Sequence, residues 1–313
     1  ITGGTGTDSL VMINAATGTA SLAANITGVE NITISDYTAG ADPTLTIGAY
    51  TLDATFVKSL TIDASSLDAG EVFTLGGASS VTRMNITSGA GADALTLGTL
   101  ADTVDGGAGN DQITGTAGSN VITAGAGNDT VTAGTGAENI SGGAGDDTFT
   151  LAGNLNSADT IDGGDGTDTL TITSGITTAS VMGGVSNIEV IQPLAALTIT
   201  ANGSLGGANS FDLSDDTDQV LTLTSAAAGG TYSGDTTVML TNIAAGTDDD
   251  TNADTVTNSK GVTLNVIGYA DNFDAGTTIT GSATATDTIT VIADGNDAIL
   301  SGTTYLDKVV IQD

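Results

Sequence analysis

The chain has 313 residues, with 37 acidic side chains against four basic ones and with no histidine and no cysteine. The net charge of −33 argues against nucleic acid and anionic membranes as partners, because both recruit basic patches. Without histidine and cysteine there is no Ser-His-Asp triad, no zinc-protease motif and no disulfide bond, and zinc and copper lack their usual ligands. We therefore expect no enzymatic activity.

The composition predicts an all-β protein. Glycine is abundant with 45 residues, proline is rare with two, and Thr, Val and Ile recur throughout, as is typical of strands joined by tight turns. A mean hydropathy of +0.19 indicates apolar material to bury, which argues against a disordered acidic chain. No stretch reaches the length of an apolar membrane span, so we expect no membrane insertion. The first residue is not Met and lies at the start of a repeat, so we interpret the chain as a fragment.

In chain order, the first motif is the nonapeptide GGTGTDSLV at residues 3–11, which places Asp8 in its sixth position. This nonapeptide opens a larger repeat, which spans residues 1–34 and recurs at residues 161–191. A weaker copy occupies residues 279–312, with Asp287 in the corresponding position. Internal repetition of this kind favours a solenoid or a string of stacked modules over one compact globule.

Strand-rich spacers separate these motifs. Runs such as SLTIDASSL (59–67), QVLTLTS (219–225) and DTITVIA (287–293) alternate with a period of two, which predicts strands. The apolar residues are small and aromatics make up only 3%, so we expect the spacers to continue a thin solenoid rather than to form sandwiches. We divide the chain into an N-terminal β module (1–87), a central repeat region (88–171) and C-terminal strand-rich modules (172–313).

The central region carries the strongest signal. Residues 88–150 divide into seven nine-residue blocks that approximate G-G-x-G-x-D-x-U-x, where U is apolar, and blocks 106–114 and 142–150 match in full. In a chain that is 39% hydrophobic, seven apolar U positions in register arise by chance roughly once in a thousand cases. Each block predicts a short strand and a glycine-rich turn, with residues eighteen apart stacked at about 4.8 Å. The U positions are Leu95, Val104, Ile113, Ile122, Val131, Ile140 and Phe149.

The sixth positions form two predicted edges. On the first edge they are Asp93, Asp111, Asp129 and Asp147; on the second they are Asp102, Asn120 and Glu138. Carboxylates stacked about 5 Å apart repel by roughly 1 kcal/mol per neighbour even in water, so the first edge requires cations. Ca²⁺ suits it, because this ion takes six to eight carboxylate and carbonyl oxygens, whereas Mg²⁺ demands a stricter octahedron. We expect several ions, each bridging two successive aspartates, and we expect the second edge to bind weakly or to stay empty.

The two edges are predicted to extend beyond Phe149. A twelve-residue stretch follows, and then a complete block at 163–171. If residues 151–153 bulge out, Asp159 continues the second edge and Asp168 continues the first, which adds a fourth site between Asp147 and Asp168.

These blocks resemble the RTX (repeats-in-toxin) family, whose glycine-rich nonapeptides fold into calcium-loaded parallel β-rolls. The match covers residues 88–171, with one copy at 3–11, and a flexible Gly/Asp-rich linker does not explain an apolar residue at every ninth position. The resemblance implies ions held by the sixth-position aspartates, Asp8 and Asp168 included, and by turn carbonyls. Departures at Thr116, Ser119, Asn120 and Glu138 weaken the second edge. The implied turn glycines are Gly89, Gly91, Gly106, Gly107, Gly109, Gly125, Gly127, Gly142, Gly143, Gly145, Gly163, Gly164 and Gly166.

Other acidic clusters lie in the C-terminal part. Each is open to two interpretations, an irregular Ca²⁺ loop or a solvated polar loop. The cluster at 246–255 approaches an EF-hand pattern, but Ala253 replaces the glycine and Ser259 the bidentate glutamate. The acidic positions are Asp212, Asp215, Asp216 and Asp218, then Asp248, Asp249, Asp250 and Asp254, and then Asp271 and Asp274.

The resemblance also implies a cellular context. RTX proteins leave the cell by type I secretion and fold outside it, where Ca²⁺ is abundant, so we expect a secreted protein at the bacterial cell surface. The mosaic of repeats and Thr/Ala-rich spacers is most similar to RTX-containing S-layer proteins, which predicts self-assembly, with cell-surface polysaccharide as a second candidate partner. The first alternative is an extender or binding segment of a large RTX adhesin. The second is ice binding through the outward-facing Thr96, Thr114, Thr132 and Thr150.

Overall fold

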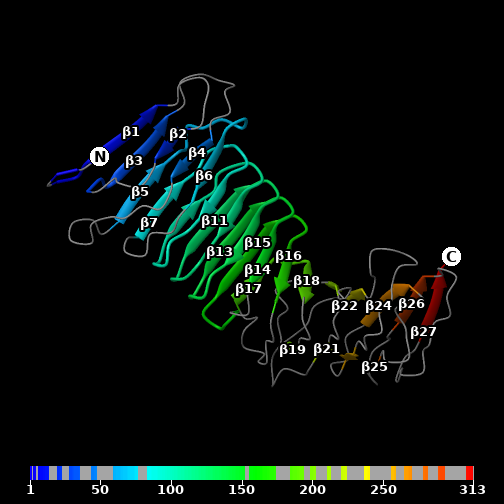
Figure 1. The fold of residues 1–313 in the computed structure, drawn as a ribbon. Coiled ribbons are helices and arrows are strands. Elements are labelled where there is room, and N and C mark those ends of the chain that lie inside the picture. Colours follow the sequence, from blue (N-terminus) through cyan, green and yellow to red (C-terminus); the bar gives the residue numbers. More distant parts are fainter. Residues whose placement is uncertain are drawn as a thin grey trace. The chain divides into compact units, whose positions relative to one another are not determined.

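The fold, taken from a computed structural model, is all-β and built from parallel strands (Figure 1). The chain divides into two units, the first comprising residues 1–154 and 158–168 and the second comprising residues 155–157 and 169–313. The structure describes residues 1, 3–4, 6–13, 20–22, 28–35, 44–47, 59–76, 83–151, 155–173, 184–193, 198–201, 210–212, 220–223, 236–239, 255–258, 264–269, 278–280, 288–292 and 308–312.

The first unit is a parallel β-solenoid made of two sheets. Successive strands enter the two sheets alternately, so two strands and their two turns complete one coil (Figure 1). The strands of the first sheet are β1 (Ser9–Ile13), β3 (Asn31–Ser35), β5 (Ser59–Asp63), β7 (Arg83–Thr87), β9 (Thr103–Asp105), β11 (Val121–Ala126), β13 (Asn139–Ala144) and β15 (Thr160–Asp165). Those of the second are β2 (Ala20–Leu22), β4 (Thr44–Ile47), β6 (Val72–Leu75), β8 (Ala94–Thr96), β10 (Gln112–Thr114), β12 (Thr130–Ala133) and β14 (Thr148–Leu151).

The register of the repeats confirms the eighteen-residue period. Ile113 pairs with Leu95 on one side and with Val131 on the other, and Ile122 lies between Val104 and Ile140 in the opposite sheet. Every predicted U position is buried, and Phe149 is among the largest fully buried side chains. Each repeat strand thus places its U side chain in the core, and burial of a side chain of this size contributes about 1.5–3 kcal/mol.

The N-terminal spacer continues the same solenoid, as predicted. β6 pairs in parallel with β8, and β7 pairs in parallel with β9, so the strands on either side of residue 87 belong to the same two sheets. The alternation that predicted strand β5 also predicts its buried face, because Leu60 and Ile62 point into the core. The boundary at 87/88 therefore separates two kinds of turn within one continuous stack.

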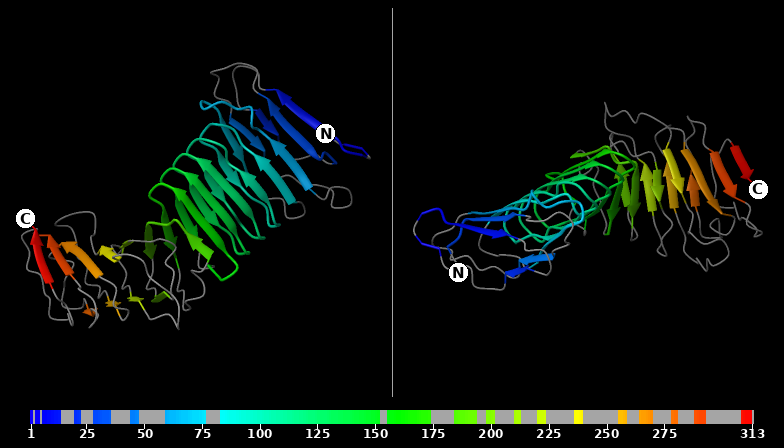
Figure 2. Two further views of the ribbon diagram at one scale, coloured as in Figure 1. Left: turned by 180° about the vertical axis from the view of Figure 1, so that it is seen from behind. Right: turned by 90° about the horizontal axis from the view of Figure 1, so that it is seen from above.

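The second unit also consists of parallel strands, which Figure 2 shows from two further directions. One sheet holds β16 (Thr169–Ile172), β18 (Val190–Pro193), β20 (Ser210–Asp212), β22 (Thr236–Met239), β24 (Leu264–Tyr269), β26 (Thr288–Ile292) and β27 (Lys308–Gln312). Another holds β19 (Thr198–Ala201), β21 (Val220–Leu223), β23 (Thr255–Asn258) and β25 (Thr278–Thr280), and β17 spans Val185–Ser186. The parallel pairing confirms the solenoid prediction for these spacers as well.

Most of the C-terminal acidic clusters fall outside the described residues. Asp212 is the last residue of β20. The positions outside the described residues are Asp215, Asp216, Asp218, Asp248, Asp249, Asp250, Asp254, Asp271, Asp274 and Asp287. Among the residues that the structure describes, no helix has the length and apolar character needed to cross a membrane.

Candidate metal centre

The sixth-position aspartates of the first edge form one buried column, as predicted. We call this set the first-edge column: Asp93, Asp111, Asp129, Asp147 and Asp168. From Asp111 onward, each carboxylate accepts, through Oδ1, the backbone N–H of the aspartate one coil earlier. The distance from N to Oδ1 is 2.8 Å for Asp93 to Asp111, 2.7 Å for Asp111 to Asp129, and 2.8 Å for both Asp129 to Asp147 and Asp147 to Asp168. One oxygen of each carboxylate therefore ties two coils together.

The second carboxylate oxygen has a different environment. The Oδ2 atoms of Asp111, Asp129 and Asp147 are buried and accept no hydrogen bond. Leaving a buried charged acceptor without a partner costs on the order of 3 kcal/mol or more. Such a row of oxygens is stable only when a proton or a cation neutralises it.

The pKa values of these groups also indicate that a proton or a cation must neutralise the column. The pKa of Asp111 is raised to about 7, mainly by burial and also by the neighbouring carboxylates of Asp129 and Asp93. Burial also raises the pKa of Asp129 and of Asp147 to about 6, and for Asp147 the charges of Asp129 and Asp168 add to the effect. Without a cation, the column holds protons at a pH where ordinary aspartates have lost them.

Glycines bring backbone oxygens close to the column. Gly125 has a φ of +125°, which favours glycine, and a Cβ at this position would overlap the carbonyl oxygen of Gly107 one coil earlier. The same overlap recurs for Gly143 against Gly125, and at the fourth position for Gly127 against Gly109. The glycine turns therefore stack in contact, and their carbonyl oxygens form two further columns along the first edge.

The predicted glycines also leave room beside the carboxylates. A Cβ at Gly106 would lie 2.7 Å from Asp111 Oδ2, and one at Gly142 would overlap Asp147 Oδ2. The free carboxylate oxygens thus face the first position of their own turns. Side chains there are small or absent, so no large side chain crowds these buried oxygens.

This donor set fits Ca²⁺. Among the described residues, no group of three or more His, Cys, Asp or Glu side chains converges on one point. A site on the first edge therefore combines one or two carboxylates with backbone carbonyls. Ca²⁺ accepts that mixture in a flexible shell of six to eight oxygens, whereas zinc prefers nitrogen and sulfur.

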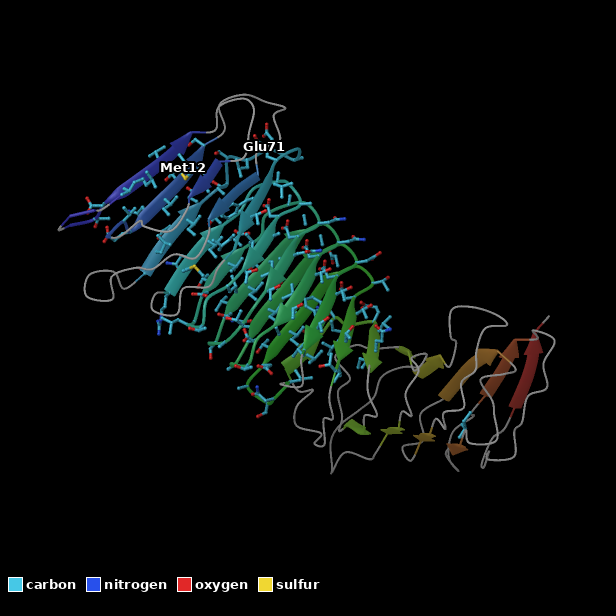
Figure 3. All side chains as sticks on the ribbon, viewed as in Figure 1. Met12 and Glu71 are labelled. Carbon is cyan, nitrogen blue, oxygen red and sulfur yellow. The ribbon has the colours of Figure 1, made fainter. Side chains whose placement is uncertain are left out.

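At the N-terminal end of the column, both carboxylate oxygens of Asp93 have hydrogen-bond donors. Asp93 Oδ2 accepts hydrogen bonds from the Ser88 hydroxyl and from Gly89 N–H (3.2 Å), and Asp93 Oδ1 accepts Phe73 N–H at 2.6 Å. The turn before β6 contains the buried Glu71, labelled in Figure 3, whose Oε2 accepts Asp68 N–H at 2.9 Å. Asp93 thus lies in the predicted position, but both of its oxygens already have protein partners.

The second edge is also a continuous column, which we call the second-edge column: Asp102, Asn120, Glu138 and Asp159. Asn120 Oδ1 accepts Asp102 N–H at 3.0 Å, and Glu138 Oε2 accepts Asn120 N–H at 3.1 Å. Asp159 Oδ1 accepts Glu138 N–H at 2.8 Å across a separation of 21 residues. Asp147 and Asp168 are also 21 residues apart, which confirms an insertion of three residues. The predicted bulge at 151–153 is wrong at its first residue, because Leu151 ends β14 and pairs with Ala133; residues 152–154 lie outside the described part.

The N-terminal nonapeptide repeats this arrangement in part. Asp8 Oδ2 accepts Gly4 N–H at 2.6 Å, and Asp8 N–H donates to Glu30 Oε2 at 2.7 Å. Glu30 therefore takes the sixth position of the following coil, although no glycine-rich block surrounds it. Sequence reasoning singled out Asp8 and missed Glu30; the signal was an acidic residue directly before the strand Asn31–Ser35.

A third row of side chains was not anticipated. Asn110 and Asn128, in the fifth position of their blocks, accept through Oδ1 the N–H of Asn128 (2.9 Å) and Asp146 (3.0 Å), one coil later. Asp146 Oδ1 likewise accepts Thr167 N–H at 2.8 Å. These exposed side chains fasten each coil to the next, in the direction opposite to the aspartate column. Recurrence of Asn or Asp at the fifth position was the available signal.

The raised pKa values predict how the metal-free protein responds to pH. In the unfolded chain these aspartates titrate near 3.8, whereas in the folded chain they titrate at about 6 to 7. The folded state therefore binds more protons between these values, and its stability falls as the pH rises from about 4 to 7. We expect calcium-free protein to unfold at a lower urea concentration at pH 6 than at pH 5. An unfolding midpoint that rises with pH in this window would contradict the assignment.

Comparison with known proteins supports the calcium interpretation. A family model described as the RTX calcium-binding nonapeptide repeat matches four times, at residues 87–122, 96–131, 114–149 and 155–176. Comparisons with curated proteins and with solved structures gave no match. The matched segments contain the first-edge column and the glycine turns described above, and such repeats bind several calcium ions. Residues 87–149 and 155–176 therefore carry RTX calcium-binding nonapeptide repeats.

Proposed function

We propose that the first-edge column holds calcium through the Oδ2 atoms of Asp111, Asp129 and Asp147, with Asp168 completing the last site. The observation that carries this proposal is the row of buried Oδ2 atoms without hydrogen-bond partners. The carbonyl oxygens of the stacked glycine turns, among them Gly107, supply further ligands. Calcium replaces the protons that the column otherwise retains, so the free energy of ion binding becomes free energy of folding.

We further propose that the chain is a secreted structural protein that assembles on the bacterial cell surface as an S-layer-type subunit. Its support is the combination of calcium-binding repeats with a second, strand-rich unit of parallel sheets. A low basic content suits a protein whose acidic surface requires divalent cations outside the cell. Neither unit provides a histidine or cysteine for catalysis, and we assign this chain no enzymatic role.

Electron microscopy of the purified chain tests the assembly proposal. We expect two-dimensional sheets or tubes at millimolar Ca²⁺, dispersal by EGTA, and no assembly when Mg²⁺ replaces Ca²⁺ at equal ionic strength. Isolated rods would instead favour an extender segment of a large adhesin. Particles that bind calcium and stay monomeric at high protein concentration would overturn the S-layer assignment and leave calcium-dependent folding intact.

A further inference from the structure

The second-edge column differs from the first in how its buried polar atoms are paired. Asp102 accepts Met84 N–H through Oδ1 at 2.8 Å and Gly98 N–H through Oδ2 at 2.9 Å. Both of its oxygens therefore have backbone partners. This contrasts with Asp111 on the first edge, whose Oδ2 accepts no hydrogen bond although the residue is equally buried.

Asn120 continues this direct pairing into the next coil. Its Oδ1 accepts Asp102 N–H, which fixes the orientation of the amide and directs Nδ2 the other way. Nδ2 donates to Glu138 Oε1 and to the carbonyl oxygen of Ala117, both at 3.4 Å. An amide nitrogen thus provides positive dipole between a carboxylate and a carbonyl, the two ligand types that a calcium ion joins on the first edge.

Thr116 makes a second substitution of the same kind. It replaces the second glycine of its block, and its hydroxyl donates to the carbonyl oxygens of Gly98 and Leu97 in the coil before. On the first edge the corresponding position is Gly125, which has no side chain to reach the carbonyls of the coil before. The Thr116 hydroxyl therefore supplies these carbonyl oxygens with a hydrogen-bond donor of the protein in place of an ion.

The second edge also carries fewer adjacent negative charges than the first. The first-edge column contains five consecutive aspartates, whereas the neutral Asn120 separates Asp102 from Glu138. Burial raises the pKa of Asp102, but backbone hydrogen bonds and the nearby Arg83 guanidinium lower it again. Repulsion along the second edge is consequently smaller, and a protein cation already offsets part of it.

We infer that Asn120 and Thr116 are specificity-determining residues that close the second edge to calcium between Asp102 and Glu138, so that in these coils ions bind along the first edge only. The inference rests on the proposed calcium sites of the first edge. Its basis is the geometry of the donors. On the second edge an amide and a hydroxyl donate hydrogen bonds to carboxylate and carbonyl oxygens, the same kinds of oxygen that bind cations on the first edge. One edge of the solenoid is then fastened by ions and the other by direct hydrogen bonds.

A gain of sites tests this assignment. The double variant Thr116→Gly, Asn120→Asp restores the repeat consensus and stacks Asp102, position 120 and Glu138 as consecutive carboxylates. We expect the number of calcium ions bound per chain, measured by equilibrium dialysis, to rise by at least one over the unsubstituted protein. Asn128→Asp is the matched control, because it adds the same charge at an exposed fifth position of the first edge, and it should leave the number unchanged.

A second variant guards against misfolding of the double variant. Glu138→Gln removes a carboxylate and retains an oxygen that can accept the Asn120 amide. We expect its calcium stoichiometry to equal that of the unsubstituted chain. A lower stoichiometry for Glu138→Gln, or no gain for a folded double variant, would overturn the inference. An unsubstituted chain that binds no calcium would instead overturn the proposed first-edge sites, so the two failures are distinguishable.

Discussion

Removing calcium is expected to unfold the first unit. A ligand present at about 100 times its dissociation constant stabilises the folded state by about 2.7 kcal/mol per site. Three Oδ2 atoms in the first-edge column are free to bind ions, so sites built on Asp111, Asp129 and Asp147 together contribute about as much as the net stability of a typical domain, 5–15 kcal/mol. We expect EGTA at pH 7.5 to abolish the contribution of the first unit to the β signal in far-ultraviolet circular dichroism, and excess Ca²⁺ to restore it.

Magnesium provides the control for this experiment. Its smaller, stricter octahedral shell fits poorly to a site made of flexible turn carbonyls and shared carboxylates, so equimolar Mg²⁺ should restore little of the signal. A metal-free protein at pH 7.5 that shows the same spectrum and the same thermal midpoint as the calcium-loaded protein would contradict the proposed role of the column.

The substitution Asp129→Asn is expected to change the sign of its effect with calcium. The asparagine keeps an Oδ1 that can accept Asp111 N–H, and it replaces only the free Oδ2. With calcium present, losing a ligand shared by two sites should lower the unfolding free energy by about 5 kcal/mol, at about 2.7 kcal/mol per site. Without calcium, the variant should be more stable than the unsubstituted chain, because it removes a buried carboxylate whose pKa burial raises to about 6.

Four proteins, the unsubstituted chain and three variants, would be compared by urea unfolding in Ca²⁺ and by the β signal that each retains in EGTA. Asp105→Asn is the matched control: it removes the same charge from an exposed position of β9 and should shift stability little in either buffer. Asp102→Asn should cost less than Asp129→Asn in calcium, because it removes one backbone hydrogen bond and no calcium ligand. Destabilisation of Asp129→Asn by equal amounts in both buffers would identify a purely structural role.

The sequence predicted the stacking because its period is strict. An apolar residue at every ninth position, flanked by glycines that tolerate positive φ, predicts that residues eighteen apart stack. Ile113 pairs with Leu95 and Val131 as expected. The three-residue insertion was predictable for the same reason, since a complete block resumes at 163–171. Spacer strands such as β5 and β21 followed from their alternation, and the small size of their side chains indicated a thin core.

The hydrogen-bond partners of individual oxygens were not predictable. The consensus places Asp93 and Asp111 in equivalent positions. Ser88 and Gly89 nevertheless donate hydrogen bonds to Oδ2 of Asp93, whereas Oδ2 of Asp111 accepts none. Such differences depend on a single side chain in the adjacent turn. The tie between Asp8 and Glu30 was missed for a related reason, because no block motif marks the coil that contains Glu30.

The opposed rows of the first edge restrict how such a protein can change in length. Asp129 fastens its coil to the one before, while Asn128 fastens it to the one after, so every coil is bonded in both directions along the chain. Adding or deleting a single block would exchange the two edges and place Asn120-type turns against aspartate turns. Growth by duplication therefore proceeds in pairs of blocks, whereas small insertions such as the one after Leu151 are tolerated where a strand ends.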